Sequence, residues 1–505
     1  METVFEKVNC AETLCHRVIL IGLLAIAIIL RLSAFQGYAT SDARGYSALA
    51  DDLARGTLHI PKYVGPPVFP LRLGAYGPTA GLIRLFGLSE VTLAAYPFAV
   101  SIAGCLLAYV LARSFFSPLA GLIGLGAVAI LPIDVSMASS LWVDAIAAFW
   151  ANVGVALAYS AFNKSTVPKA VFLGLLSGGF FGVSWLCKEG VVYLIPFVVI
   201  LGLALQRQTP LALRIKCMMG IAIAAILVLS VETAFYEKLT GDPLFRLHTT
   251  ERNYEWSPWG FFDESSLSGL VKRLFLDGPI ALLRSMSFAP TFAMLGAIWG
   301  VVFRKRVFVT PTTWLISLLF MFNFMTTSLK SYKPLLLSDR YLYAIVLPSM
   351  ILLGGFLSAL LLSDDDRRLL TERRFWAVAL IAAICTISAF GVRREIILKP
   401  QQVQRNVAAR LQSSDVIYTD FRTAADLVFF RTGLLLPSNA TTIPWEGVDE
   451  KGFPEGAYVL INKENIDFLS TTYKYEIPSF VAKPPSTWRR DRSYSSADLY
   501  VIHSN

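Results

Sequence analysis

Long apolar segments separated by short polar ones fill the chain from near its N-terminus to about Phe390. A helix that crosses a lipid bilayer needs roughly 20 mostly apolar residues, so the pattern predicts a polytopic α-helical membrane protein with about eleven transmembrane helices. The predicted spans are Val18–Ala34, Val91–Leu111, Pro118–Ala138, Val143–Phe162, Ala170–Cys187, Gly190–Leu205, Cys217–Phe235, Met286–Phe303, Val307–Met325, Tyr341–Leu362 and Phe375–Phe390.

Lysine and arginine gather in the loops on one side of these segments, which the positive-inside rule places in the cytoplasm. The residues are Arg113, Lys164, Lys169, Arg207, Arg214, Lys216, Arg304, Lys305, Arg306, Arg367, Arg368, Arg373 and Arg374. We therefore expect a multi-pass protein of the cell (inner) membrane with its N-terminus inside and its C-terminus outside.

The composition agrees with a membrane protein. Hydrophobic residues make up 55% of the chain and charged residues only 16%, whereas soluble domains carry about 25% charged residues. The formal net charge of +9 is accounted for largely by the cytoplasmic loops, so no nucleic-acid partner is needed to explain it.

The predicted topology leaves three regions outside and divides the chain into a membrane domain, 1–391, and an extracytoplasmic domain, 392–505. Outer loop one covers 35–90, where Ser41 is expected to cap a surface helix over Asp42–Arg55. The stretch from Pro61 to Pro78 is rich in proline and is not expected to form regular helix. The second outer loop, 236–285, carries the clustered aromatic residues Trp256, Trp259, Phe261 and Phe262.

The C-terminal domain is predicted to be a small α/β domain, because short apolar segments alternate with helical ones. The expected strands are Val416–Thr419, Tyr458–Asn462 and Leu499–His503, and the expected helices are Gln401–Leu411, Thr423–Arg431 and Glu464–Thr472.

Ionisable residues at membrane depth or at its outer surface are functional candidates, because burying a charge there is costly. They are Asp42, Asp134, Asp144, Lys188, Glu189, Lys330, Lys333 and Arg340. Arg31 is expected to reach the interface by extending its side chain outward. A carboxylate can take a proton from an attacking hydroxyl or amine, and cations can stabilise a phosphate leaving group.

Several short motifs follow one another on the predicted outer side. They are SDARGYSALA over Ser41–Ala50, Phe69–Arg72 with Tyr76–Pro78 and Leu85–Gly87, Asp144, Trp185–Gly190, and Asp339–Leu342 followed by Pro348. In their order and sidedness they resemble the GT-C glycosyltransferases, and within them the protein O-mannosyltransferase and aminoarabinose transferase superfamily. The resemblance covers about Val18–Leu362 and the general layout of the C-terminal domain.

The resemblance implies transfer of a sugar from a polyprenyl-phosphate donor to an envelope glycan, lipid or protein at the outer face of the membrane. Asp42 would be the general base, and Asp144 would position the acceptor or the sugar. Donor phosphate would bind to Lys188, Arg340, Arg72 and Lys333. Substrate contacts would come from Tyr46, Glu189 and Tyr341, although Tyr46 also suits plain helix packing.

Alternatives stay open at this point. The chain has Gly65–Val68 where aminoarabinose transferases carry Glu-Lys-Pro-Pro, and Ala43 where protein mannosyltransferases have a second acid, so the motifs do not identify the acceptor. No cofactor is certain, but Asp42, Asp144 and Glu189 could hold a divalent metal. A transporter or flippase of lipid-linked saccharides, and an external polymerase or ligase with a diphosphate donor, are the other functions considered.

Overall fold

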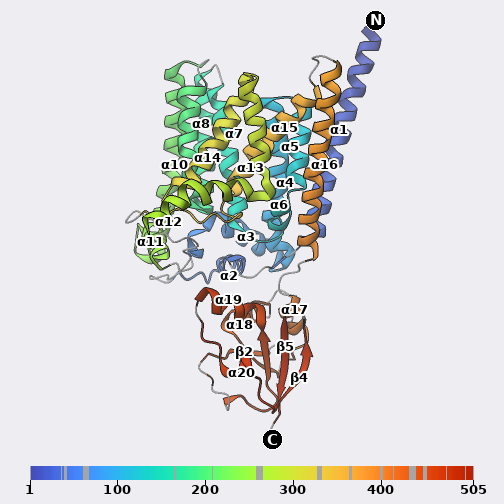
Figure 1. Cartoon of the computed structure of the whole chain (residues 1–505). Helices are drawn as coiled ribbons and strands as arrows, with labels where there is room; N and C mark the ends of the chain where they lie inside the picture. Colours follow the sequence, from blue (N-terminus) through green and yellow to red (C-terminus); the bar gives the residue numbers. More distant parts are fainter. Residues whose placement is uncertain are drawn as a thin grey trace.

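The computed structural model shows a helical bundle joined to a smaller sheet domain (Figure 1). It describes residues 2–503 other than 36, 39–41, 61–67, 164–165, 207–208, 257–265, 327–331, 363–366, 398–401, 413, 431–439, 447, 449–451, 474 and 495. The N-terminus lies at one end of the bundle, and the sheet domain lies beyond the other. We call this second end, which carries α2 (Asp42–Arg55) and α3 (Leu73–Phe86), the domain end.

Among the described residues, eight helices are long and apolar enough to cross a membrane, which makes this an integral membrane protein. They are α1 (Glu2–Ser33), α4 (Glu90–Phe115), α7 (Val143–Phe162), α8 (Val167–Cys187), α10 (Leu211–Thr240), α12 (Leu267–Lys272) continued through η4 (Arg273–Asp277) into α13 (Gly278–Val302), η5 (Arg306–Phe308) with α14 (Val309–Phe324), and η6 (Tyr343–Ile345) with α15 (Val346–Leu362).

Three shorter apolar helices occupy the other predicted spans. They are α5 (Pro118–Ala129), the run of η2 (Glu189–Leu194), α9 (Ile195–Ile200) and η3 (Leu201–Leu205), and the middle of α16 (Arg367–Ile397). The helical membrane fold is confirmed, and the count of about eleven crossings stays a prediction.

The single span predicted over Pro118–Ala138 is wrong, because the helix breaks after Ala129 and resumes as α6 (Pro132–Met137). Pro132 has no amide hydrogen and cannot continue the helical bonds of α5. Arg31 donates to a carbonyl left free at the end of α5, since its Nη1 lies 3.0 Å from the Ala129 carbonyl oxygen. The expectation that Arg31 reaches the interface is therefore also wrong: its exposed fraction is 0%.

The helix predicted over Asp42–Arg55 is confirmed as α2, which ends at Gly56 with a positive φ of 74°. The predicted capping residue, Ser41, lies outside the described residues. Helix α2 packs against η1 (Phe69–Leu71) and α3.

The prediction that regular helix is absent up to Pro78 is wrong, because Pro78 lies inside α3; residues 61–67 are outside the described part. Proline leaves the carbonyl four residues earlier without its helical donor. Here that carbonyl belongs to Gly74, and the Tyr96 hydroxyl donates to it at 3.3 Å.

The second outer loop forms α11 (Phe245–Trp256) and α12; the aromatic residues Trp259, Phe261 and Phe262 lie outside the described residues. At Ser285 the chain turns sharply, and the next three residues have φ between 51° and 65°. Such left-handed conformations are costly for residues with side chains. The Met286 amide donates to the carboxyl of Asp339, which ties this turn to the segment before η6.

The C-terminal domain is an α/β domain, as predicted. Its five-stranded sheet has the order β2-β1-β3-β5-β4, with β1 parallel to β2 and β3, and β5 antiparallel to β3 and β4. The elements are α17 (Gln402–Ala408), β1 (Val416–Thr419), α18 (Phe421–Phe429), β2 (Thr441–Pro444), β3 (Tyr458–Asn462), α19 (Lys463–Tyr473), α20 (Ser479–Ala482), β4 (Trp488–Ser493) and β5 (Ala497–Ile502).

Strands β1 and β3 match the prediction, and β5 begins earlier than expected. Strands β2 and β4 were missed. Neither has a continuous apolar face, since β4 is exposed after its first residue and β2 has no buried position.

The sheet domain is attached to outer loop one through α17 and α18. Arg405 pairs with Glu90, and the ring of Tyr38 stacks on Phe429 with the ring centroids 4.3 Å apart. Arg44 of α2 donates to Asp426 of α18 at 2.9 Å. Helix α2 therefore contacts the C-terminal domain through Arg44, and it lies between the bundle and the sheet domain (Figure 1).

Asp426 makes stability depend on pH. Burial raises its pKa to about 6, against the opposing effect of Arg44. The folded state therefore holds this proton more tightly than the unfolded state, so the free energy of unfolding should fall by about 3 kcal/mol as pH rises from about 4 to 6, and level off above that. We expect Asp426→Asn to lose this pH-dependent part of the free energy of unfolding. The measurement is the change in melting temperature between pH 4.5 and 7.

Asp467→Asn, on the exposed face of α19, is the matched control and should keep the wild-type pH dependence. Equal pH dependence of the melting temperature in Asp426→Asn and wild type would contradict the assignment.

Candidate functional site

The predicted site residues come from four segments that meet at the domain end. Asp42 begins α2 and Asp144 lies in the first turn of α7, where the helix dipole favours a negative charge. Lys188 lies between α8 and η2, and Arg340 and Tyr341 lie just before η6. Helix ends thus bring these side chains together from positions far apart in the sequence.

Five of these residues form one connected group, which we call the acid–cation cluster: Asp42, Asp144, Lys188, Arg340 and Tyr341. Arg340 donates to Asp42 at 2.7 Å and to the Tyr341 hydroxyl at 2.6 Å. Lys188 pairs with Asp144. The Lys188 ammonium and the Arg340 guanidinium lie 3.9 Å and 4.6 Å from the centre of the Tyr341 ring, so the ring links the two ion pairs.

The cluster holds two carboxylates and two cations, and one of the two pairs is open to a ligand. The side chains of Asp42 and Arg340 are 30% and 27% exposed, whereas that of Asp144 is 5% exposed. Burial lowers the pKa of Arg340, but Asp42, Tyr341 and Asp144 outweigh it and raise the pKa above its usual value. The accessible cation therefore keeps its charge whenever a ligand reaches it.

Trp142 belongs to this site and was missed by the sequence analysis. Its ring centroid lies 5.4 Å from the Arg340 guanidinium carbon, within the range of cation–π attraction. The available signal was its place in the outer turn two residues before Asp144.

Arg72 and Glu189 lie in a second network, beside the acid–cation cluster. The guanidinium of Arg72 makes a two-pronged contact with the Glu189 carboxylate, with one N–O distance of 3.1 Å. Arg246 contacts the same carboxylate at 3.4 Å and also pairs with Glu232. Glu232 in turn accepts a hydrogen bond from Trp185 at 2.7 Å.

Arg246 and Glu232 were not singled out from the sequence, because each looks like an ordinary charge at the edge of a span. In the structure, Arg72 and Glu189 pair with each other. The roles of Arg72 as a phosphate ligand and of Glu189 as a substrate ligand stay predictions.

Tyr46 lies between the cluster and the second network. Its side chain is 3% exposed and packs edge-on against Phe69 at 5.0 Å. Burial, followed by the charge of Asp42, raises the pKa of Tyr46 well above its usual range. The phenol therefore stays neutral and closes the base of the site as a packing residue with a polar end.

A backbone hydrogen bond holds the segment that carries Lys333. Its amide donates to the Thr326 hydroxyl at 3.0 Å, beside the bridge that pairs Thr326 with Pro334. This segment leads directly to Arg340.

The three carboxylates considered as metal ligands each lie on a cation: Asp42 on Arg340, Asp144 on Lys188 and Glu189 on Arg72. Within the described part of the chain, no group of three or more His, Cys, Asp or Glu side chains is arranged to hold a metal. The divalent metal stays a prediction.

The structure thus combines a helical membrane domain, a first-loop helix that begins with an acid, and a C-terminal α/β domain. No protein-family model and no curated protein sequence matches this chain.

Solved structures do match it. The chain is similar to ArnT from Cupriavidus metallidurans in the apo state (TM-score 0.53, 13% identity, 95% of this chain and 97% of that chain covered). The same enzyme bound to undecaprenyl phosphate gives a TM-score of 0.51 at 12% identity, with the same coverage. The apo oligosaccharyltransferase of Archaeoglobus fulgidus gives 0.53 at 12% identity, over 96% of this chain and 74% of that chain. The GT-C fold predicted from the motifs is thereby confirmed.

The second network should be important for stability. Arg246→Met would leave Glu232 buried without its cation, and breaking such a pair costs about 3 to 5 kcal/mol. We expect a clearly lower melting temperature in detergent. The control is Lys272→Met, whose pair with Asp277 has a 63% exposed lysine side chain and should contribute less than about 1 kcal/mol. Similar small losses in both variants would show that the network is not a stabilising element.

Proposed function

We propose that this protein is a glycosyltransferase that moves a sugar from a polyprenyl-phosphate donor to an envelope glycan, lipid or protein acceptor. The observation that carries the proposal is the acid–cation cluster, in which a partly exposed carboxylate lies 2.7 Å from a cation that is also partly exposed. General-base chemistry and stabilisation of a phosphate leaving group need these two groups side by side.

The structural likeness supports the same chemistry. The ArnT structure bound to undecaprenyl phosphate, and an AglB structure from Archaeoglobus fulgidus in complex with an inhibitory peptide and a dolichol-phosphate (TM-score 0.51, 11% identity), share the fold. Both lipids named there end in a phosphate on a polyprenyl chain. A membrane enzyme with paired cations at the end of its bundle suits such a donor, because the chain can stay in the bilayer.

In the proposed reaction, a hydroxyl or amine of the acceptor attacks the anomeric carbon of the sugar. The new bond joins the acceptor to that carbon, and the bond from the carbon to the phosphate oxygen breaks. Asp42 takes the proton of the acceptor, and polyprenyl phosphate leaves with the bonding electrons on its oxygen. Arg340 and Lys188 stabilise that charge, while Asp144 orients Lys188.

We place this chemistry at the outer face of the cell membrane, with the C-terminal domain on the same side. The positions of Lys and Arg in the sequence support that orientation, and the site lies at the opposite end of the bundle from the N-terminus (Figure 1).

The first test is transfer by the purified protein from a panel of polyprenyl-phosphate sugars to envelope lipid, glycan and protein acceptors. Asp42→Asn should lower transfer at least a hundredfold, because the amide cannot accept the proton, and its melting temperature should stay near that of wild type. The control is Asp52→Asn on the same helix, at an exposed position, which should transfer normally.

Full activity of Asp42→Asn would remove Asp42 from the mechanism. Transfer only from diphosphate-linked glycans would favour a polymerase or ligase, and movement of the lipid without transfer would favour a flippase. The same assay with and without EDTA tests the metal. We expect transfer to persist in EDTA, since Lys188 and Arg340 already stand where the leaving charge develops.

Donor binding should exchange ion-pair partners. A phosphate that binds Arg340 replaces Asp42 as its partner, which frees the carboxylate to act as a base. Asp42→Asn should therefore bind undecaprenyl phosphate about two- to fivefold more tightly than wild type, in line with the strength of a partly exposed ion pair. Arg340→Gln should bind it at least tenfold more weakly. Quenching of tryptophan fluorescence suits the measurement, because Trp142 lies against Arg340.

Arg55→Gln is the control for these changes in charge, since Arg55 pairs with Asp51 on the exposed side of α2. Weaker or unchanged binding by Asp42→Asn would exclude the exchange, even if the transfer assay succeeds.

A further inference from the structure

We propose that Arg31 and Asp134, which lie inside the bundle, are positioning residues for the acid–cation cluster. In this role they fix the turn that carries Trp142 and Asp144. The inference rests on the proposed function for its effect on activity, but it also has a readout that does not depend on activity.

Each of the three guanidinium nitrogens of Arg31 has a hydrogen-bond partner. Its guanidinium pairs with Asp134 and donates to the Ser101 hydroxyl at 2.6 Å. Its remaining donors reach the carbonyl oxygens of Ala27 at 2.9 Å and Ala129 at 3.0 Å, with longer contacts to Val128 and Cys105. A charge at this depth is costly unless it is paired and hydrogen-bonded, and here it is both.

The pair of Arg31 and Asp134 joins the end of α5 to α6 and α4. Helix α5 ends at Ala129 and α6 begins at Pro132, and the last carbonyls of a helix need donors from elsewhere. Arg31 caps the end of α5 and at the same time holds Asp134 in α6. Ser101 of α4 donates to Asp134 at 2.7 Å. One guanidinium thus sets how the two helices and α4 meet.

A short turn connects α6 to α7, which carries Asp144 of the acid–cation cluster. The connecting turn is packed throughout, since Ser139, Ser140 and Leu141 are at most 2% exposed. It ends at Trp142, which lies against Arg340, and Asp144 follows two residues later. Because α6 has only six residues, its direction depends on the pairing of Asp134 more than on its own hydrogen bonds.

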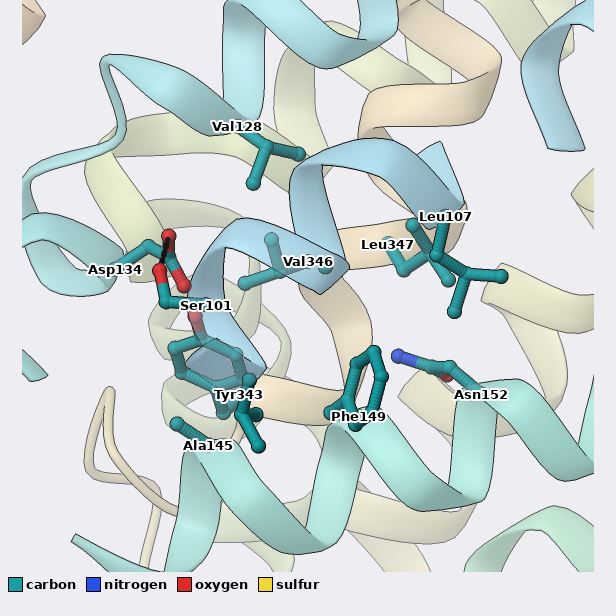
Figure 2. Close-up of a pocket in the computed structure, with 12 residues that line it drawn as sticks. Ser101, Leu107, Val128, Asp134, Ala145, Phe149, Asn152, Tyr343, Val346 and Leu347 are labelled. Atoms are coloured by element: carbon teal, nitrogen blue, oxygen red, sulfur yellow. Dashed lines mark hydrogen bonds between the residues drawn. The ribbon is translucent and has the colours of Figure 1, made fainter. Parts of the chain in front are cut away.

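The surroundings of the pair make it the main polar anchor of this region. Asp134 and Ser101 lie on the wall of a small cavity of about 40 Å³, whose labelled lining also includes Ala145 and Tyr343 (Figure 2). Ala145 adjoins Asp144, and Tyr343 follows Tyr341 by two residues. Most of the other lining side chains are apolar and cannot fix the direction of α6 by hydrogen bonds.

The test uses a double variant, Arg31→Met with Asp134→Leu, which removes the pair without leaving a buried unpaired charge. We expect kcat to fall at least a hundredfold while KM for the donor changes less than threefold, because Arg340 and Lys188 are untouched. Arg31→Lys, which can reach Asp134 but not all the carbonyls, should lose about tenfold in kcat. That intermediate value would not arise if the pair served stability alone.

Arg214→Met is the matched control. Arg214 is another buried arginine that caps helix carbonyls, those of Gly202 and Leu203 at 2.8 Å and 2.9 Å, on a segment far along the chain from the turn. This variant should lose stability but keep wild-type kcat in the folded protein. Wild-type kcat in a folded double variant would overturn the inference. If the double variant does not fold, wild-type kcat in Arg31→Lys would overturn it.

Hydrogen–deuterium exchange of the backbone amides of residues 138–144 separates this inference from the proposed function. Exchange there should be at least tenfold faster in the double variant than in wild type, and unchanged in Arg214→Met. If wild type transfers no sugar but this difference appears, the proposed function fails and the positioning of the turn holds. If transfer succeeds and the exchange rates are equal, the positioning role fails alone.

Discussion

The absence of water in the core of a bilayer is the constraint that organises this protein. Every backbone donor and acceptor freed by a break in a helix must find a partner within the protein. Three such places are visible: Arg31 caps the end of α5, the Tyr96 hydroxyl donates to the carbonyl that Pro78 leaves free, and Arg214 caps the end of η3. The end of α5 lies next to α6, which leads to the turn that carries Trp142, and Pro78 lies within α3 at the domain end.

Side-chain burial separates the two charged networks at the domain end. Around Arg246 the ions are buried and pair with one another, so they hold α11 to α8 and α10 and offer little to a ligand. In the acid–cation cluster, Asp42 and Arg340 remain partly exposed. A pair of that kind costs little to open, and an incoming phosphate can take the place of the carboxylate. Accessibility of the pair, rather than the number of charges, therefore distinguishes the proposed reactive site from its neighbour.

Sequence patterns predicted what depends on local preference. Apolar length indicated the spans, an acid with following helical periodicity indicated α2, and apolar strands such as β1 and β3 were placed correctly. The outer position of Asp42, Asp144, Lys188 and Arg340 was enough to place them at one level, and the structure brings them into contact. Pairing could not be predicted, because it depends on how helices turn about their axes; the contacts of Glu189 with Arg72 and Arg246 were therefore not foreseen. Arg31 was misjudged because sequence does not show that α5 breaks beside it.

Helix α2 shows how these parts act together. It begins with Asp42, and two residues later Arg44 donates to Asp426 of the C-terminal domain, while Tyr46 on another face packs against Phe69. Asp42 must first leave its cation and then take a proton. For the carboxylate to act as a base, its backbone should stay in place during this exchange. Anchoring α2 on both sides meets that requirement, and it gives the C-terminal domain a part in the site although none of the cluster residues belongs to it. The C-terminal domain is thus a support for the helix that carries the proposed base.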